Sequence, residues 1–172
     1  MRPKTLVLGV GNPILGDDGV GVTVARILRE QLPELTDVEI EEASIGGLPL
    51  AESIIGYDTS FIIDATSLDG GQEGDIVALG VDELGEALHT SNPHDLDFTT
   101  ALSLVRSTGN KLPTLRIYGI RIKDEKVFSE SLTPKIADAA RVCSGMVLSE
   151  IKRIRNDALG PTHCGDLFAK VN

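Results

Sequence analysis

The chain alternates short apolar runs with longer amphipathic segments, and this alternation restricts the fold more than any other feature of the sequence. The first run, residues 5–10, is almost wholly apolar, which is typical of a parallel strand covered on both faces. Residues 20–32 then repeat apolar side chains at helical spacing. Because strands that alternate with helices build α/β domains, we expect an α/β fold.

The same reasoning predicts the remaining elements. Further strands are expected at residues 38–42, 60–64, 76–79 and 115–122, and further helices at 48–55, 95–107 and 133–155. The strand at 76–79 is the weakest and is predicted to be an antiparallel edge. Asp95 or Asp97 would cap the helix that follows it. The predicted fold is a three-layer α/β/α sandwich with a twisted, mainly parallel five-stranded sheet.

Size and composition restrict the class of protein. With 172 residues, the chain fits one domain, expected at 1–159, and residues 160–172 are predicted to form a flexible tail. The net charge of −10 and an aromatic content of 3% argue against nucleic-acid binding. No apolar run reaches the roughly 18 residues of a membrane span. The sequence therefore predicts a protein that is not inserted in a membrane.

Cysteine usage indicates the compartment. The two cysteines, Cys143 and Cys164, show no pairing pattern, and the first residues do not resemble a signal peptide. We therefore expect a cytoplasmic protein in a reducing environment. Cys143 and Met146 are expected in the core, on the inward face of the last helix.

The glycine-rich segment at residues 9–21 follows the first predicted strand and is the most informative motif. It is not a dinucleotide-binding fingerprint, because Ile14 occupies the third glycine position. It has the glycine spacing of a phosphate-binding loop, but Asp17 and Asp18 replace the lysine and the hydroxyl residue. Two carboxylates repel phosphate, whereas carboxylates at the carboxyl end of a parallel strand suit a cation.

A simpler interpretation is that Asp17 or Asp18 only caps the helix at 20–32, which contributes about 0.5–2 kcal/mol. One cap explains one aspartate but not two. Asp64 adds another carboxylate at the end of the strand predicted at 60–64. An ionised carboxylate there is costly unless it is paired or binds a metal, which favours the cation site.

A histidine would complete such a site. His94 lies in a loop before a predicted helix, and His89 and His163 are the other candidates. One imidazole nitrogen with two carboxylates is a ligand set accepted by Zn²⁺, Ni²⁺, Mn²⁺ or Fe²⁺. For His163, which lies beside Cys164 in the predicted tail, a disordered terminus is the preferred interpretation.

Several of these motifs together resemble one known family. The matching stretches are Leu8–Asn12, Gly16–Gly21, Ile63–Ala65, His94 with Leu96, and Leu132–Pro134. The sequence is similar to the maturation endopeptidases of nickel–iron hydrogenases. The resemblance implies that Asp18, Asp64 and His94 bind a divalent metal together and form the catalytic site.

The resemblance also implies an activity and a partner. Members of this family are hydrolases that remove a C-terminal extension from the precursor of the hydrogenase large subunit after nickel insertion. The implied metal is the nickel carried by that precursor, or another divalent metal such as zinc. Asp17 or Asp18 would be the general base.

Two other functions compete with this one. The protein would otherwise be a nickel-sensing chaperone that docks on the precursor without cutting it. A nucleotide-linked enzyme is disfavoured, because Asp17 and Asp18 occupy the place where a phosphate needs hydrogen-bond donors.

Overall fold

The apolar runs form the strands of a single sheet. The strands are β1 (Thr5–Val10), β2 (Val38–Ala43), β3 (Thr59–Thr66), β4 (Ile76–Leu79) and β5 (Thr114–Arg121). Their order is β2-β1-β3-β5-β4, and every neighbouring pair is parallel except β4 with β5. β1 is buried along its whole length, as expected for a strand covered on both faces.

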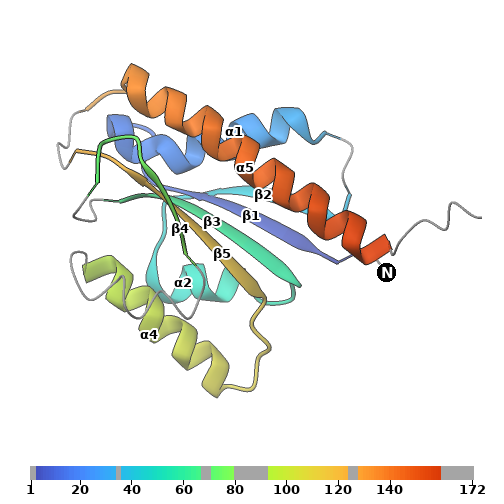
Figure 1. The fold of residues 1–172 in the computed structure, drawn as a ribbon. Coiled ribbons are helices and arrows are strands. Elements are labelled where there is room, and N and C mark those ends of the chain that lie inside the picture. The colour runs from blue at the N-terminus through green and yellow to red at the C-terminus, as the bar shows by residue number, and fades with distance from the viewer. Residues whose placement is uncertain (1–2, 34–35, 67–70, 80–92, 124–127, 160–172) are drawn as a thin grey trace, which may run out of the picture.

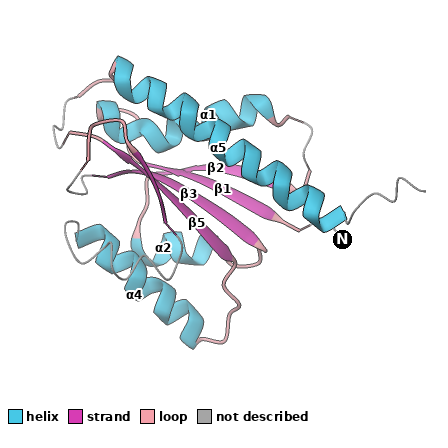
Figure 2. Cartoon of the chain, viewed as in Figure 1, coloured by secondary structure: helices cyan, strands magenta, loops and turns pink. Residues whose placement is uncertain are grey.

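Helices cover both faces of this sheet in the computed structural model. The model describes residues 3–33, 36–66, 71–79, 93–123 and 128–159, and gives only the backbone of residues 79, 93–97 and 159. The helices are η1 (Gly16–Gly19), α1 (Val20–Gln31), α2 (Gly47–Ser53), α4 (Pro93–Ser107) and α5 (Pro134–Leu159). α1 and α5 lie on one face, and α2 and α4 lie on the other (Figures 1 and 2). The predicted three-layer fold is confirmed.

Each face of the sheet has its own apolar core. Phe61 and Ile63 of β3 pack with α1 and α5, whereas Ile62 between them packs with α2 and α4. This division follows from the alternation of side chains along a strand. Each fully buried Leu, Ile or Phe contributes about 1.5–3 kcal/mol to folding. Both cores are needed to hold the sheet in the middle layer.

The order of the strands reverses between β1 and β3. β2 lies on one side of β1, and β3 lies on the other side. In open α/β sheets, ligands bind outside the carboxyl ends of the strands where the order reverses in this way. The carboxyl ends of β1 and β3 are therefore the expected ligand site.

Some element boundaries differ from the sequence prediction. α4 begins at Pro93 rather than at residue 95, so Asp95 and Asp97 lie inside the helix and the predicted cap is wrong. Proline fits the first turn of a helix because it needs no amide donor there. His94, expected in a loop, lies in that first turn. β3 continues to Thr66, beyond the predicted end at residue 64, because its last residues pair with β5.

The predictions for the two α5 residues have opposite outcomes. Cys143 is buried, and burial raises the pKa of its thiol to about 12. Met146 is 40% exposed, so its assignment to the core is wrong. It lies beside Val142 and Gly145, along the flank of α5 that faces a surface groove next to Tyr118. Helical spacing predicted an apolar position here but not which flank the sheet covers.

Among the helices that the structure describes, none is long and apolar enough to cross a membrane. The predicted tail at residues 160–172 lies outside the described residues, so the domain boundary at residue 159 stays a prediction.

Candidate functional site

Glycine brings the start of α1 against the carboxyl edge of the sheet. A Cβ atom on Gly21 would lie 2.2 Å from the carbonyl oxygen of Ile63 and 2.3 Å from that of Val10. Because both neighbours are backbone atoms, no side chain fits at this position. Ile63 directly precedes Asp64, so the first turn of α1 is held next to a predicted site residue. Close packing is the structural role of this glycine.

The loop between β1 and η1 folds tightly around Asp18. Gly11 has a φ of +136°, and a Cβ on it would lie 2.1 Å from the carbonyl oxygen of Asp18. The amide of Asn12 donates to Oδ2 of Asp18 at 2.8 Å. Among the described residues, no group donates to Oδ1 of the same half-buried carboxylate. Asp18 is therefore oriented through its Oδ2 atom.

Asp17 points to a different part of the molecule. Its Oδ1 accepts a hydrogen bond from the amide of Thr133 at 2.7 Å, and its Oδ2 accepts one from the Thr133 hydroxyl at 3.0 Å. Thr133 directly precedes α5. The N-cap of α1 is Gly19, and no side-chain hydrogen bond caps this helix. The interpretation of Asp17 or Asp18 as the cap of this helix is therefore wrong.

Asp64 lies on β3 at the place where the neighbouring β1 ends. The last pair between the two strands is Gly9 with Ile63, and Asp64 follows it, in register with Gly119 of β5. By strand alternation it shares the sheet face of Ile62, which is the face covered by α2 and α4. Its carboxylate is half-buried, and Oδ1 accepts a hydrogen bond from the amide of Ala65 at 2.8 Å.

The segments that carry Asp18 and Asp64 meet at this edge, because η1 packs against β3. The end of α4 leads into the start of β5, at the amino edge of the sheet. The first turn of α4, which contains His94, therefore lies towards the carboxyl edge (Figure 1). The His94 side chain is outside the described part of the structure, as are His89 and His163 entirely. The three-residue metal site therefore stays a prediction.

The side chains that are described do not by themselves form a metal site. Among them, no group of three histidine, cysteine, aspartate or glutamate residues lies close enough together to hold a metal ion. Two carboxylates and one imidazole are a donor set that suits Ni²⁺ or Zn²⁺. Asp18 and Asp64 fit this set, since both are half-buried and their segments meet at the carboxyl edge of the sheet.

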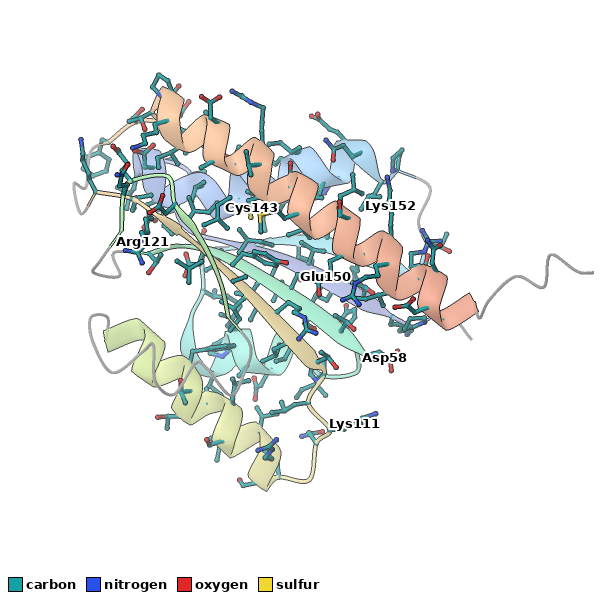
Figure 3. All side chains as sticks on the ribbon, in the orientation of Figure 1. Asp58, Lys111, Arg121, Cys143, Glu150 and Lys152 are labelled. Atoms are coloured by element: carbon teal, nitrogen blue, oxygen red, sulfur yellow. The ribbon has the colours of Figure 1, made fainter. Side chains whose placement is uncertain are left out.

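Positive charge also lies near the site. Arg121 pairs in register with Thr66, two residues beyond Asp64, and Figure 3 shows it at the carboxyl edge of the sheet. Arg121 could not be found from local sequence patterns, because the pairing of β3 with β5 is what brings it close. At the end of β2, Arg26 and Arg29 donate hydrogen bonds to Glu42 and lower the pKa of its carboxyl group. The negative charge of Glu42 is therefore balanced by the positive charges of these two arginines.

Comparison with known proteins identifies relatives of this chain. Residues 22–150 match the family model of the hydrogenase maturation protease HycI. The chain is 33% identical over 137 residues to the hydrogenase 2 maturation protease of Escherichia coli strain K12, and the match covers 77% of each protein. The family match begins at residue 22 and so includes Asp64 and His94 but not Asp18.

Solved structures agree with this result. The hydrogenase maturating endopeptidase HybD from E. coli superimposes with a TM-score of 0.74 at 28% identity, over 87% of this chain and 93% of that one. The [NiFe] hydrogenase maturation protease HybD from Thermococcus kodakarensis gives a TM-score of 0.68 at 23% identity, over 85% and 97%, which shows the shared fold. From the family match, the sequence identity and the common fold together, the chain belongs to the hydrogenase maturation proteases.

Proposed function

We propose that this protein is an endopeptidase that removes the C-terminal extension from the precursor of a [NiFe]-hydrogenase large subunit once nickel has been inserted. Family membership supports a role in processing hydrogenase precursors. The observation that carries the proposal furthest is the meeting of the Asp18 and Asp64 segments at the carboxyl edge of the sheet, where β1 and β3 are neighbours. The substrate is a polypeptide, and its nickel is cargo that the protease inspects.

The residues at this edge of the sheet have the chemistry for this inspection. Asp18 and Asp64 would offer carboxylate oxygens to the nickel of the precursor, and His94 would offer an imidazole nitrogen. Asp18 is oriented for this role by the Asn12 amide on Oδ2. A divalent metal held by these groups supplies Lewis acidity, which polarises a carbonyl or lowers the pKa of a bound water towards 7.

Recognition of nickel would then make cleavage of the extension depend on nickel insertion into the precursor. A precursor without nickel lacks the ion that bridges it to the three side chains, so it would bind weakly or in the wrong position. The protease would therefore distinguish finished from unfinished precursors by metal coordination rather than by the sequence of the extension.

The test compares Asp64, near the carboxyl end of β3, with Asp58, which directly precedes the strand. Asp64→Asn removes the charge at the carboxyl edge, whereas Asp58→Asn changes the exposed aspartate at the amino end, which Figure 3 labels and whose Oδ2 accepts from the Lys4 amide at 2.9 Å. Nickel-loaded precursor is incubated with each variant and its intact mass is followed. Loss of a direct metal ligand should slow cleavage by more than the ~10–100-fold typical of outer-sphere partners, whereas Asp58→Asn should cleave normally.

Two results would contradict the proposal. Normal cleavage by Asp64→Asn, with circular dichroism showing a folded protein, would remove Asp64 from the site. A full-length precursor that stays in a stable complex with the wild-type protein, measured by size-exclusion chromatography, would replace the peptidase with a nickel-sensing chaperone.

A further inference from the structure

We infer that the two adjacent aspartates of the motif have different roles, and that Asp17 is a positioning residue that fastens the Asp18 loop to the start of α5. We call the contact between Asp17 and Thr133 the clasp. The inference rests on the proposed function for what Asp18 does, but its geometry stands on the described contacts alone.

The clasp uses both oxygens of the Asp17 carboxylate. The amide of Thr133 donates to one and the hydroxyl of Thr133 donates to the other, at 2.7 and 3.0 Å. The Thr133 carbonyl then accepts the amide of Ala137 at 2.9 Å, which is the first bond of α5. Asp17 is thereby connected to the helix framework, and its side chain is committed to a residue 116 positions away.

A second set of bonds strengthens the same junction. The amide of Gly16 donates to the carbonyl of Ser129 at 2.7 Å, and the amide of Ser129 donates to the carbonyl of Ile14 at 3.1 Å. Leu15 and Ser129 form a parallel β-bridge between these bonds. The residues that precede the two partners of the clasp are therefore paired along their backbones.

The element that carries Asp18 needs such support. η1 is a 3-10 helix of only four residues. The hydrogen bond from the amide of Asp18 to the carbonyl oxygen of Leu15 at its start is long, at 3.3 Å. Short 3-10 turns have poor hydrogen-bond geometry and little stability of their own. The clasp therefore fixes the backbone from which Asp18 projects, and the Asn12 amide then fixes the Asp18 side chain.

This assignment separates two explanations for a requirement for Asp17. A general base or metal ligand needs the negative charge itself, whereas a clasp needs only an acceptor for the Thr133 amide and a partner for its hydroxyl. An asparagine at position 17 supplies both, because its carbonyl oxygen accepts from the amide and its NH₂ group donates to the hydroxyl oxygen.

The test uses Asp17→Ala, Asp17→Asn, Thr133→Val and the double variant Asp17→Ala/Thr133→Val. Cleavage of nickel-loaded precursor gives kcat/KM, and NMR measures the hydrogen-exchange rate of the Asn12 amide, which Asp18 protects. Asp17→Ala should lower kcat/KM by about 10–100-fold, the usual cost of losing an outer-sphere partner, and should accelerate Asn12 exchange. Thr133→Val should show a smaller loss, because it keeps its amide donor.

Two further comparisons make the prediction sharper. Asp17→Asn should retain most of the activity and the Asn12 protection. The double variant should be no worse than Asp17→Ala, because the hydroxyl has no partner once the carboxylate is gone.

The inference is overturned if Asp17→Asn loses as much activity as Asp17→Ala while Asn12 exchanges at the wild-type rate in both, since the charge would then act in the chemistry. If wild-type protein cleaves no precursor, the proposed function fails and exchange alone decides the clasp. Unchanged Asn12 exchange in Asp17→Ala would then contradict it, and faster exchange would support it.

Discussion

At the scale of single residues, position 21 is restricted by backbone atoms rather than by side chains. Carbonyl oxygens of β1 and β3 occupy the space where a Cβ would stand, and neither can rotate away as a flexible side chain could. The glycine therefore determines how closely α1 approaches the strand that carries Asp64.

A methyl group at this position should separate the helix from the sheet. Gly21→Ala is expected to lower the free energy of unfolding by about 3 kcal/mol, at the upper end of the usual cost of overpacking a core. Urea denaturation measures the change. Gly145→Ala on α5 is the matched control, since among the described residues no atom beyond the backbone of its own helix lies within 4 Å of the added Cβ, and alanine favours a helix by about 0.5–1 kcal/mol. A Gly21→Ala protein as stable as wild type would contradict this account of the motif.

The candidate site could be predicted from sequence only in part, and the reason is visible residue by residue. Asp18 and Asp64 stand beside predicted strand ends, so local pattern is enough to place both at the carboxyl edge of the sheet. The partner of Asp17 is Thr133, which no local pattern connects to it. Arg121 was missed for the same reason, because long-range strand pairing brings it to the edge.

At the scale of elements, the apolar pattern of buried positions made the strands and helices predictable. The ends of these elements depended on contacts with distant parts of the chain. β1 was predicted correctly at both ends because all its residues are apolar or buried. The end of β3 was missed because Ala65 and Thr66 are held by pairing with β5. η1 was not predicted, since a four-residue turn has no periodicity to detect.

The contact of α5 with β5 depends on an ionised group. The hydroxyl of Tyr118 donates to Glu150 at 2.7 Å, and Nε of Arg116 donates to it at 2.9 Å. Burial disfavours the charged form of Glu150, but these two hydrogen bonds and the positive charges of Arg116 and Arg153 together outweigh burial. The pKa of its carboxyl group therefore lies below the ordinary value. The charged carboxylate thus stabilises the native state.

This stabilisation should depend on pH in a defined direction. A carboxyl group with a lowered native pKa stabilises the fold above the unfolded pKa of about 4.3, and the contribution is lost as the pH falls through the native pKa. Glu150→Gln should therefore lower the free energy of unfolding by about 1 kcal/mol at pH 7, and the difference should shrink below pH 4. Chemical denaturation at several pH values measures this difference.

The control for this prediction is Glu30→Gln, an exposed change on α1, which should alter the unfolding free energy by less than about 0.5 kcal/mol. A difference between wild type and Glu150→Gln that stays constant from pH 7 to pH 3 would show that charge is not what holds α5 to β5.

At the scale of the whole molecule, α5 is fastened at both edges of the sheet. Thr133, just before the helix, binds Asp17 at the carboxyl edge. Near the other end, Arg155 forms an ion pair of 3.0 Å with Asp37, which precedes β2, and both side chains are largely buried. A helix of 26 residues is about 39 Å long, so these two contacts brace the site against the opposite side of the molecule.

Intact-mass spectrometry of the large-subunit precursor tests the proposal that nickel in the precursor is required for cleavage. The same precursor is prepared with and without nickel and incubated with the wild-type protein. Only the nickel-loaded form is expected to lose a C-terminal peptide. Equal cleavage of both forms would contradict nickel recognition, and no cleavage of either form would contradict the endopeptidase itself.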